Sequence, residues 1–180
     1  IVLEPLASSY AVLNDEEKQM GVCLIDIGGG TTDVAVFIRG GLRYSGIIGL
    51  GGQNVTNDVG IGLRTSWDDA ERIKCAHGSA MRDEIADVEQ IEVAGIAGRS
   101  AQPIPRRDLA YIVEARMEEL FELAHQQVSA GISGAVLRAG IVLTGGGAQV
   151  KGAAALAERV FNAPVRLGAP VRLGGVADEV

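Results

Sequence analysis

The chain has 180 residues and a formal net charge of −7, and its length predicts one domain, or one domain with an insert. Neither a membrane span nor a nucleic-acid-binding surface is indicated, because the sequence holds no apolar run near ~20 residues and no block of Lys and Arg. Cys23 and Cys75 stand far apart without a CxxC pattern, which argues against a disulfide framework and a zinc site and fits a reducing, cytosolic setting.

Three segments near the start of the chain are predicted to be consecutive strands. Residues 22–27 form an apolar run with one carboxylate near its end, residues 34–38 form a β-branched run, and residues 42–48 form a third strand. Glycines at 28–30 and 40–41 separate the three. Short glycine turns between consecutive strands predict an antiparallel meander.

Three amphipathic helices are predicted after the meander. The apolar face of the first consists of Val55, Val59 and Leu63. An S-x-x-D capping box over residues 66–69 opens the second, which ends near residue 77. The third begins at a cap on Asp108 and runs to about residue 129. Its apolar stripe consists of Leu109, Val113, Met117, Leu120, Ala124 and Val128.

The remaining segments complete an α/β pattern. Residues 139–144 are a buried aliphatic strand, followed by a helix over about 149–160 and a short strand at 165–167. Residues 78–104 mix charges with short β-prone pieces, notably 88–93. This order predicts an α/β fold with a mixed sheet, flanking helices and a smaller segment inserted between two portions of the sheet.

Glycine accounts for 25 residues, about twice its usual ~7% share, and one glycine cluster carries the strongest chemical signal. It is the stretch Asp26-Ile27-Gly28-Gly29-Gly30-Thr31-Thr32-Asp33. Glycines allow successive backbone N–H groups to converge on an anion, the hydroxyls of Thr31 and Thr32 add donors, and Asp26 can hold the water shell of Mg²⁺. The alternative is a glycine-rich hairpin in which Asp26 only holds the turn. The order of acidic and hydroxyl residues favours phosphate binding.

Two further motifs are weaker by themselves. A glycine turn after the strand at 139–144 contains Gly145, Gly146, Gly147 and Ala148. Such a strand-to-helix turn lets a flat ring approach the backbone beside a helix N-terminus, although many α/β proteins have one purely for packing. Glu71 and Lys74 share a helix face, which indicates a surface ion pair worth ~0.5 kcal/mol or less. The alternative is that both reach the hydroxyls of a ribose.

Together and in this order, the three motifs resemble the second half of the actin, Hsp70 and sugar-kinase ATPase fold, which is ribonuclease H-like. Residues 26–33 resemble its second phosphate loop, residues 143–148 its adenosine loop, and Glu71 with Lys74 its ribose-contacting helix. The resemblance narrows to the C-terminal half of FtsA, the actin-like family of bacterial cell division proteins, over segments 49–58, 70–74, 141–148 and 165–170. The first residue, Ile1, is not Met, which agrees with a piece of a longer chain.

The resemblance implies that the chain binds ATP with Mg²⁺ and is a weak ATPase at most. It implies a large nucleotide-binding subdomain over residues 1–55 and 119–180 and a smaller inserted subdomain over residues 56–118. Asp26 would hold Mg²⁺ through water, and Glu4 would orient the attacking water. The alternative for Glu4 is that it only lies in the first turn of a helix, where the helix dipole favours a carboxylate. The implied nucleotide contacts are Gly28, Gly29, Gly30, Thr31, Thr32, Gly51, Gly52, Glu71, Lys74, Gly145, Gly146, Gly147 and Ala148.

The resemblance also implies partners. Arg116 matches the arginine with which this family pairs the acidic C-terminal peptide of the tubulin homologue FtsZ; a snorkelling arginine with a local Glu partner is the alternative. The full-length protein is expected to assemble into actin-like protofilaments. It would link FtsZ filaments to the cytoplasmic face of the inner membrane at the division site, through a C-terminal helix outside this chain. Alternative families with this fold are Hsp70-like ATPases and PilM-like pilus-assembly homologues, which bind nucleotide and a peptide partner.

Overall fold

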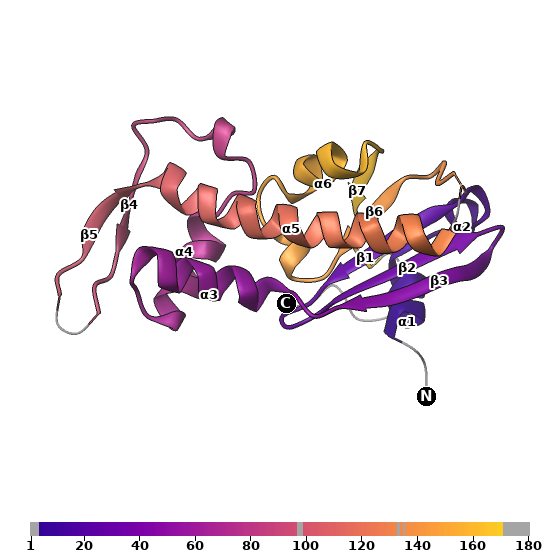
Figure 1. Cartoon of the computed structure of the whole chain (residues 1–180), viewed down its shortest axis with the longest axis horizontal. Helices are drawn as coiled ribbons and strands as arrows, with labels where there is room; N and C mark the ends of the chain where they lie inside the picture. The colour runs from indigo at the N-terminus through magenta and orange to yellow at the C-terminus, as the bar shows by residue number, and fades with distance from the viewer. Residues whose placement is uncertain (1–3, 97–98, 133, 135, 171–180) are drawn as a thin grey trace, which may run out of the picture.

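The computed structural model describes residues 4–96, 99–132, 134 and 136–170, and a mixed five-stranded sheet lies in the right half of the view in Figure 1. The strands are β1 (Val22–Ile27), β2 (Thr32–Ile38), β3 (Gly41–Ile48), β6 (Ile141–Thr144) and β7 (Val165–Leu167). Their order is β3-β2-β1-β6-β7, in which β1, β2 and β3 are antiparallel neighbours while β6 runs parallel to both β1 and β7. The predicted antiparallel meander and mixed sheet are therefore confirmed.

Both faces of β1 are covered, which explains why this strand is apolar on successive residues. Ile25 packs in the larger core, which helix α5 (Arg106–Ile132) covers, whereas Leu24 packs in a smaller core with residues of α1 (Glu4–Val12). Alternate strand residues point to opposite faces, so a strand buried on both sides is apolar at successive positions, as β1 is from Val22 to Ile25. The short helix α2 (Asp15–Met20) lies after α1 and contacts β2.

Helix α5 is the longest element and runs along much of the molecule (Figure 1). Every residue of its predicted apolar stripe is buried, and α6 (Ala153–Phe161) packs beside it. A stripe at steps of three and four keeps one face of the helix against the sheet and leaves the opposite face polar. Within the described ranges, no helix has both the length and the apolar composition to cross a membrane.

A second group of elements lies beside the five-stranded sheet (Figure 1). It contains α3 (Gly52–Leu63), α4 (Trp67–His77), the 3₁₀ turn η1 (Arg82–Glu84) and the antiparallel hairpin of β4 (Gln90–Val93) and β5 (Gln102–Pro105). Ser66 caps the start of α4, because its hydroxyl accepts the N–H of Asp69 at 3.2 Å, and the Asp69 carboxylate accepts from that same hydroxyl at 2.9 Å. The predicted limits of the inserted subdomain, 55/56 and 118/119, fall inside α3 and α5, so the division into two subdomains stays a prediction.

Two predicted helix starts are wrong. Helix α5 begins at Arg106, so Asp108 lies in its first turn rather than at its cap, a position that the helix dipole still favours for a carboxylate. Helix α6 begins at Ala153, because Gly152 has φ +80°, a left-handed conformation that interrupts a helix. The 3₁₀ turn η2 (Gly147–Gln149) occupies the segment where the helix was predicted to start.

Candidate functional site

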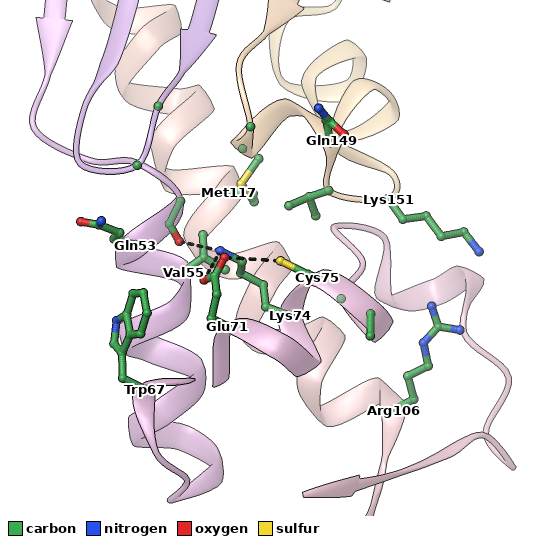
Figure 2. Close-up of a pocket in the computed structure, with 18 residues that line it drawn as sticks. Gln53, Val55, Trp67, Glu71, Lys74, Cys75, Arg106, Met117, Gln149 and Lys151 are labelled. Atoms are coloured by element: carbon green, nitrogen blue, oxygen red, sulfur yellow. Dashed lines mark hydrogen bonds and ion pairs between the residues drawn. The ribbon is translucent and has the colours of Figure 1, made fainter. Parts of the chain in front are cut away.

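A cavity of about 600 Å³ lies where the two glycine turns meet helix α4 (Figure 2). The predicted site residues that line it are Gly28, Gly29, Gly52, Glu71, Lys74, Gly146 and Gly147. The predicted residues that are not among those lining it are Asp26, Gly30, Thr31, Thr32, Gly51, Gly145 and Ala148. The fold therefore brings three motifs that are distant in the sequence to one cavity.

The first glycine turn is bound to the start of α3 by backbone hydrogen bonds. The carbonyl of Gly28 accepts the N–H of Gly52 at 2.9 Å, and the carbonyl of Gly29 accepts the N–H of Gln53 at 2.8 Å. A Cβ on Gly51 would lie 2.6 Å from both carbonyl oxygens, so only glycine permits this close approach. Gly51 thus allows the turn to lie against the start of α3.

The two threonines after this turn have different environments. Thr31 is exposed, and its carbonyl accepts the N–H of Gly28 at 2.9 Å, which closes the turn. Thr32 is fully buried, and its hydroxyl donates to the carbonyl of Leu50 at 2.8 Å. The hydroxyl of Thr32 therefore ties β2 to the segment before α3 instead of facing the cavity, which differs from the role that the sequence predicts.

Glu71 and Lys74 do form an ion pair, with Nζ of Lys74 at 2.7 Å from Oε2 of Glu71, but it is not an exposed one. The Lys74 side chain is 9% exposed, and its ammonium also donates to the carbonyl of Gly52 at 3.2 Å and to the hydroxyl of Thr56 at 2.9 Å. These three acceptors match the three N–H donors of a lysine. Lys74 thereby joins α4 to the first turn of α3 (Figure 2).

The carboxylate of Glu71 is held in its ionised form. Burial raises its pKa, but hydrogen bonds from Lys74, Thr56 and Cys75 outweigh that effect and bring the pKa of Glu71 below its ordinary value. The thiol of Cys75 donates to Oε1 of Glu71 at 3.3 Å. Burial and the Glu71 carboxylate raise the pKa of Cys75, so this thiol stays protonated at neutral pH. The cavity thus contains an ionised carboxylate on α4 that is paired with Lys74.

Asp26 lies at the end of β1, between α1 and the second glycine turn. Its Oδ2 accepts a hydrogen bond from the hydroxyl of Ser8 at 2.6 Å. Its Oδ1 faces Gly145, because a Cβ added there would lie 2.5 Å from this oxygen. Gly145 also has φ +85°, so both its conformation and its surroundings require glycine. Asp26 therefore stands beside the cavity at the junction of β1 and β6.

The second glycine turn packs directly on the end of β1. A Cβ on Gly147 would lie 2.3 Å from Cγ2 of Ile27, and Ala148 is buried beneath the turn. The turn leads into η2 rather than into an α-helix, so the predicted helix N-terminus is absent from this place in the described structure. What remains at the cavity is the bare backbone of Gly146 and Gly147.

Several cavity residues were not predicted from the sequence. Gln53 and Trp67 lie toward one side of the cavity in Figure 2, and Arg106 and Lys151 toward the other. Trp67 is the only tryptophan of the chain and follows a recognised helix cap, so it could have been proposed. Arg106 and Lys151 come from distant segments that carry no shared motif, and only the tertiary structure brings them together.

Two predicted site residues remain, Arg116 and Glu4, and Arg116 is not among the residues that line the cavity. Arg116, on α5, pairs with Asp58 through Nε at 2.6 Å and Nη2 at 3.2 Å, and its third nitrogen contacts Glu119. Its guanidinium is thus already engaged by two carboxylates of this chain. Glu4 is the first residue of α1, and its side chain lies outside the described part of the structure.

The comparisons with solved structures concern the fold. MreB5 of Spiroplasma citri bound to ADP is 22% identical, with a TM-score of 0.74 over 90% of this chain and 53% of that one. The PilM–PilN type IV pilus biogenesis complex is 17% identical, with a TM-score of 0.64 over 93% of this chain and 41% of that one. These likenesses, together with the mixed sheet and its flanking helices, show the predicted actin-like ATPase fold.

The comparisons by sequence concern the family. The family model for cell division protein FtsA matches residues 23–179. The FtsA of Neisseria meningitidis serogroup B is 45% identical over 181 residues, covering 100% of this chain and 44% of the relative. The FtsA of Bacillus subtilis is 44% identical over 175 residues, covering 97% of this chain and 39% of the relative. The chain thus spans less than half the length of these relatives, and it belongs to the FtsA family of cell division proteins.

Proposed function

We propose that this chain is the nucleotide-binding part of a bacterial cell division protein and that ATP, with Mg²⁺, occupies the cavity of about 600 Å³. The observation that carries the proposal is the convergence of two glycine turns and the ionised Glu71 on one cavity. Pockets for ligands of this kind commonly measure ~300–1,000 Å³. The ADP in the MreB5 structure, which shares the fold, supports the same class of ligand.

The two glycine turns suggest how the nucleotide lies. The phosphates are placed at Gly28 and Gly29, because this turn offers the cavity a backbone without side chains, which an anion can approach closely. The base is placed against Gly146 and Gly147, whose bare backbone leaves room for a flat ring. Helix α4 lies between these ends and faces the ribose.

Glu71 and Lys74 have different roles in this arrangement. The ammonium of Lys74 has three acceptors within the protein, so it has no further N–H to offer a ribose. Glu71 is the more exposed of the two, and its carboxylate can accept hydrogen bonds from sugar hydroxyls. We therefore assign the ribose contact to Glu71 and treat Lys74 as the residue that holds Glu71 and the start of α3 in place.

The residues near the first glycine turn fit Mg²⁺ chemically. Mg²⁺ keeps several waters and is usually held by one or two carboxylates together with nucleotide phosphates. Asp26 supplies one partly exposed carboxylate beside the proposed phosphate position. When bound there, Mg²⁺ would neutralise charge on the phosphates, and Asp26 would hold its water shell. Any hydrolysis is proposed to be weak, with Glu4 orienting the attacking water.

The position of the cavity supports two subdomains. Its glycine turns come from residues proposed for the large subdomain, 1–55 and 119–180, whereas Glu71 and Lys74 come from the smaller one, 56–118. A nucleotide at this boundary would contact both. Ligand sites commonly lie between such units.

The family relationship supports further proposals for the full-length protein. It is proposed to link FtsZ filaments to the inner membrane at the division septum and to assemble into actin-like protofilaments. The acidic C-terminal peptide of FtsZ is proposed to contact Arg116. Because Asp58 and Glu119 already engage that guanidinium, the peptide carboxylate has to share it or replace one of them.

Calorimetric titration of the full-length protein with ATP and Mg²⁺ tests the nucleotide proposal. Glu71→Gln is expected to weaken binding about tenfold, or ~1.4 kcal/mol, because a neutral amide is a poorer acceptor for the ribose hydroxyls. Glu118→Gln is the matched control, since Glu118 lies on α5 and pairs with Arg159 at 3.4 Å. Absence of binding by the folded wild-type protein would overturn the proposal.

A further inference from the structure

Ser8 and Asp26 form a contact that no motif in the sequence predicts. Ser8 lies on α1 and Asp26 at the end of β1, and the Ser8 hydroxyl donates to Oδ2 of Asp26 at 2.6 Å. A hydroxyl–carboxylate distance of ~2.5–2.7 Å is typical of a charge-assisted hydrogen bond, which is stronger than a neutral one. The helix thus reaches the sheet through this side chain.

The adjacent serine makes the contrast clear. Ser9 is buried, and its hydroxyl donates to the carbonyl of Leu6 at 2.8 Å, within the same helix. A serine hydroxyl that donates to a carbonyl of its own helix makes its hydrogen bond within that helix and contacts no other element. Ser8 instead directs its hydroxyl across to β1, so its contact determines how the Asp26 side chain lies.

One oxygen of the Asp26 carboxylate is hydrogen-bonded, and the other lies close to the second glycine turn. Ser8 holds Oδ2, and Oδ1 lies against Gly145, where a Cβ would be 2.5 Å away. The carboxylate cannot turn about its last torsion without losing the Ser8 hydrogen bond. Residues that hold a metal-binding carboxylate by hydrogen bonds fix its orientation and strengthen metal binding.

We propose that Ser8 is a positioning residue, which orients Asp26 to receive the water shell of the divalent cation that binds with the nucleotide. This inference rests on the proposed nucleotide and Mg²⁺ site. It gives α1 a role in that site: Ser8 touches neither the nucleotide nor the cation and acts through Asp26.

The test measures the ADP affinity of the full-length protein over a series of Mg²⁺ concentrations. ADP affinity rises with the Mg²⁺ concentration, and the concentration that gives half of this rise is the quantity compared. Ser8→Ala is expected to increase it roughly tenfold, the lower end of the loss seen when a hydrogen-bond partner of a metal-binding side chain is removed. ADP affinity in EDTA should stay unchanged, and Ser8→Thr, which keeps the hydroxyl, should restore the Mg²⁺ dependence. Alanine is a good helix former, so α1 itself is expected to persist.

Two further variants separate the possible outcomes. Ser9→Ala removes a hydroxyl of the same helix that does not touch Asp26, and it should leave the Mg²⁺ dependence unchanged. Asp26→Asn should impair the Mg²⁺ dependence at least as much as Ser8→Ala.

If Asp26→Asn has its effect and Ser8→Ala has none, the inference is overturned while the proposed function stands. If Asp26→Asn leaves the Mg²⁺ dependence intact, the cation role of Asp26 fails, and the inference fails with it. Equal losses for Ser8→Ala with and without Mg²⁺ would also overturn the inference.

Discussion

Two cations, Lys74 and Arg116, show how much a residue's role depends on its acceptors. Both were expected to contact a ligand, and both are paired with carboxylates of the chain itself. The Lys74 side chain is 9% exposed and surrounded by acceptors, whereas that of Arg116 is 25% exposed and keeps an edge toward solvent. Lys74 therefore suits a role within the protein, where it holds Glu71 and the start of α3. Arg116 can still contact a partner peptide through its exposed edge.

The exposed edge of Arg116 leads to a prediction about the FtsZ peptide. Arg116→Glu in the full-length protein is expected to weaken binding of an FtsZ-tail peptide by at least ~1.4 kcal/mol, about tenfold, because it reverses the charge that would grip a carboxylate. Asp58→Asn is the control: it removes the competing internal carboxylate and should leave binding at least as tight as in the wild type. An unchanged peptide affinity in folded Arg116→Glu protein, measured by calorimetry, contradicts the assignment.

At the scale of elements, the contact between the first glycine turn and α3 depends on Gly51. A Cβ there would lie 2.6 Å from the carbonyl oxygens of Gly28 and Gly29, so Gly51→Ala must separate the turn from the helix. We expect a loss of ~1–3 kcal/mol in the free energy of unfolding, as for overpacked sites, together with weaker ATP binding.

Gly49→Ala is the matched control for this prediction. Gly49 is exposed, its φ is not positive, and a Cβ added there would meet no atom within 4 Å. Its effect on chemical denaturation should stay within about 0.5 kcal/mol. Similar effects of the two substitutions would show that the proposed contact does not matter.

A second contact between elements predicts a dependence on pH. Arg166 of β7 pairs with Glu17 of α2 at 2.6 Å and donates to the carbonyl of Val12 at 2.8 Å. The hydrogen bond from Arg166 lowers the pKa of Glu17 below its ordinary value of 4.5, in spite of burial. A carboxyl whose pKa is lower in the folded state contributes stability above its unfolded pKa and loses it as the pH falls through the folded pKa.

Arg166→Met should therefore lower the free energy of unfolding by about 1 kcal/mol at pH 7, the upper range for a partly exposed pair. The difference from the wild type should shrink as the pH falls below 4.5, the ordinary pKa of Glu17. Arg72→Met removes a more exposed pair within α4 and should have little effect. A difference that stays constant from pH 7 to pH 3 would contradict the role of the Glu17 carboxylate.

At the scale of the whole molecule, the pattern of apolar residues was sufficient to predict most of the fold. The meander follows from continuous apolar and β-branched runs separated by glycine turns, and the stripe of α5 follows from steps of three and four. The start of α6 was misplaced, because the left-handed conformation of Gly152 cannot be distinguished in the sequence from any other glycine. Helix ends depend on single residues and are therefore harder to predict than helix faces.

The site was less predictable than the fold. The spacing of Glu71 and Lys74 placed both on one face, but the acceptors that occupy Lys74 come from Gly52 and Thr56, which no helical period relates to it. Likewise, Thr32 was expected to face a phosphate, and its partner is the carbonyl of Leu50, 18 residues away. Motifs predicted which segments converge, whereas the hydrogen-bond partners depended on tertiary structure.

The central claim is that one nucleotide joins the two glycine turns through Glu71. The most direct test is a crystal structure of the full-length protein with ADP and Mg²⁺. The account predicts ADP in the cavity, with its phosphates at the turn of Gly28 and Gly29, its base at Gly146 and Gly147, and a ribose hydroxyl within hydrogen-bond distance of Glu71. ADP bound elsewhere, or a ribose held by Lys74 with Glu71 turned away, would contradict it.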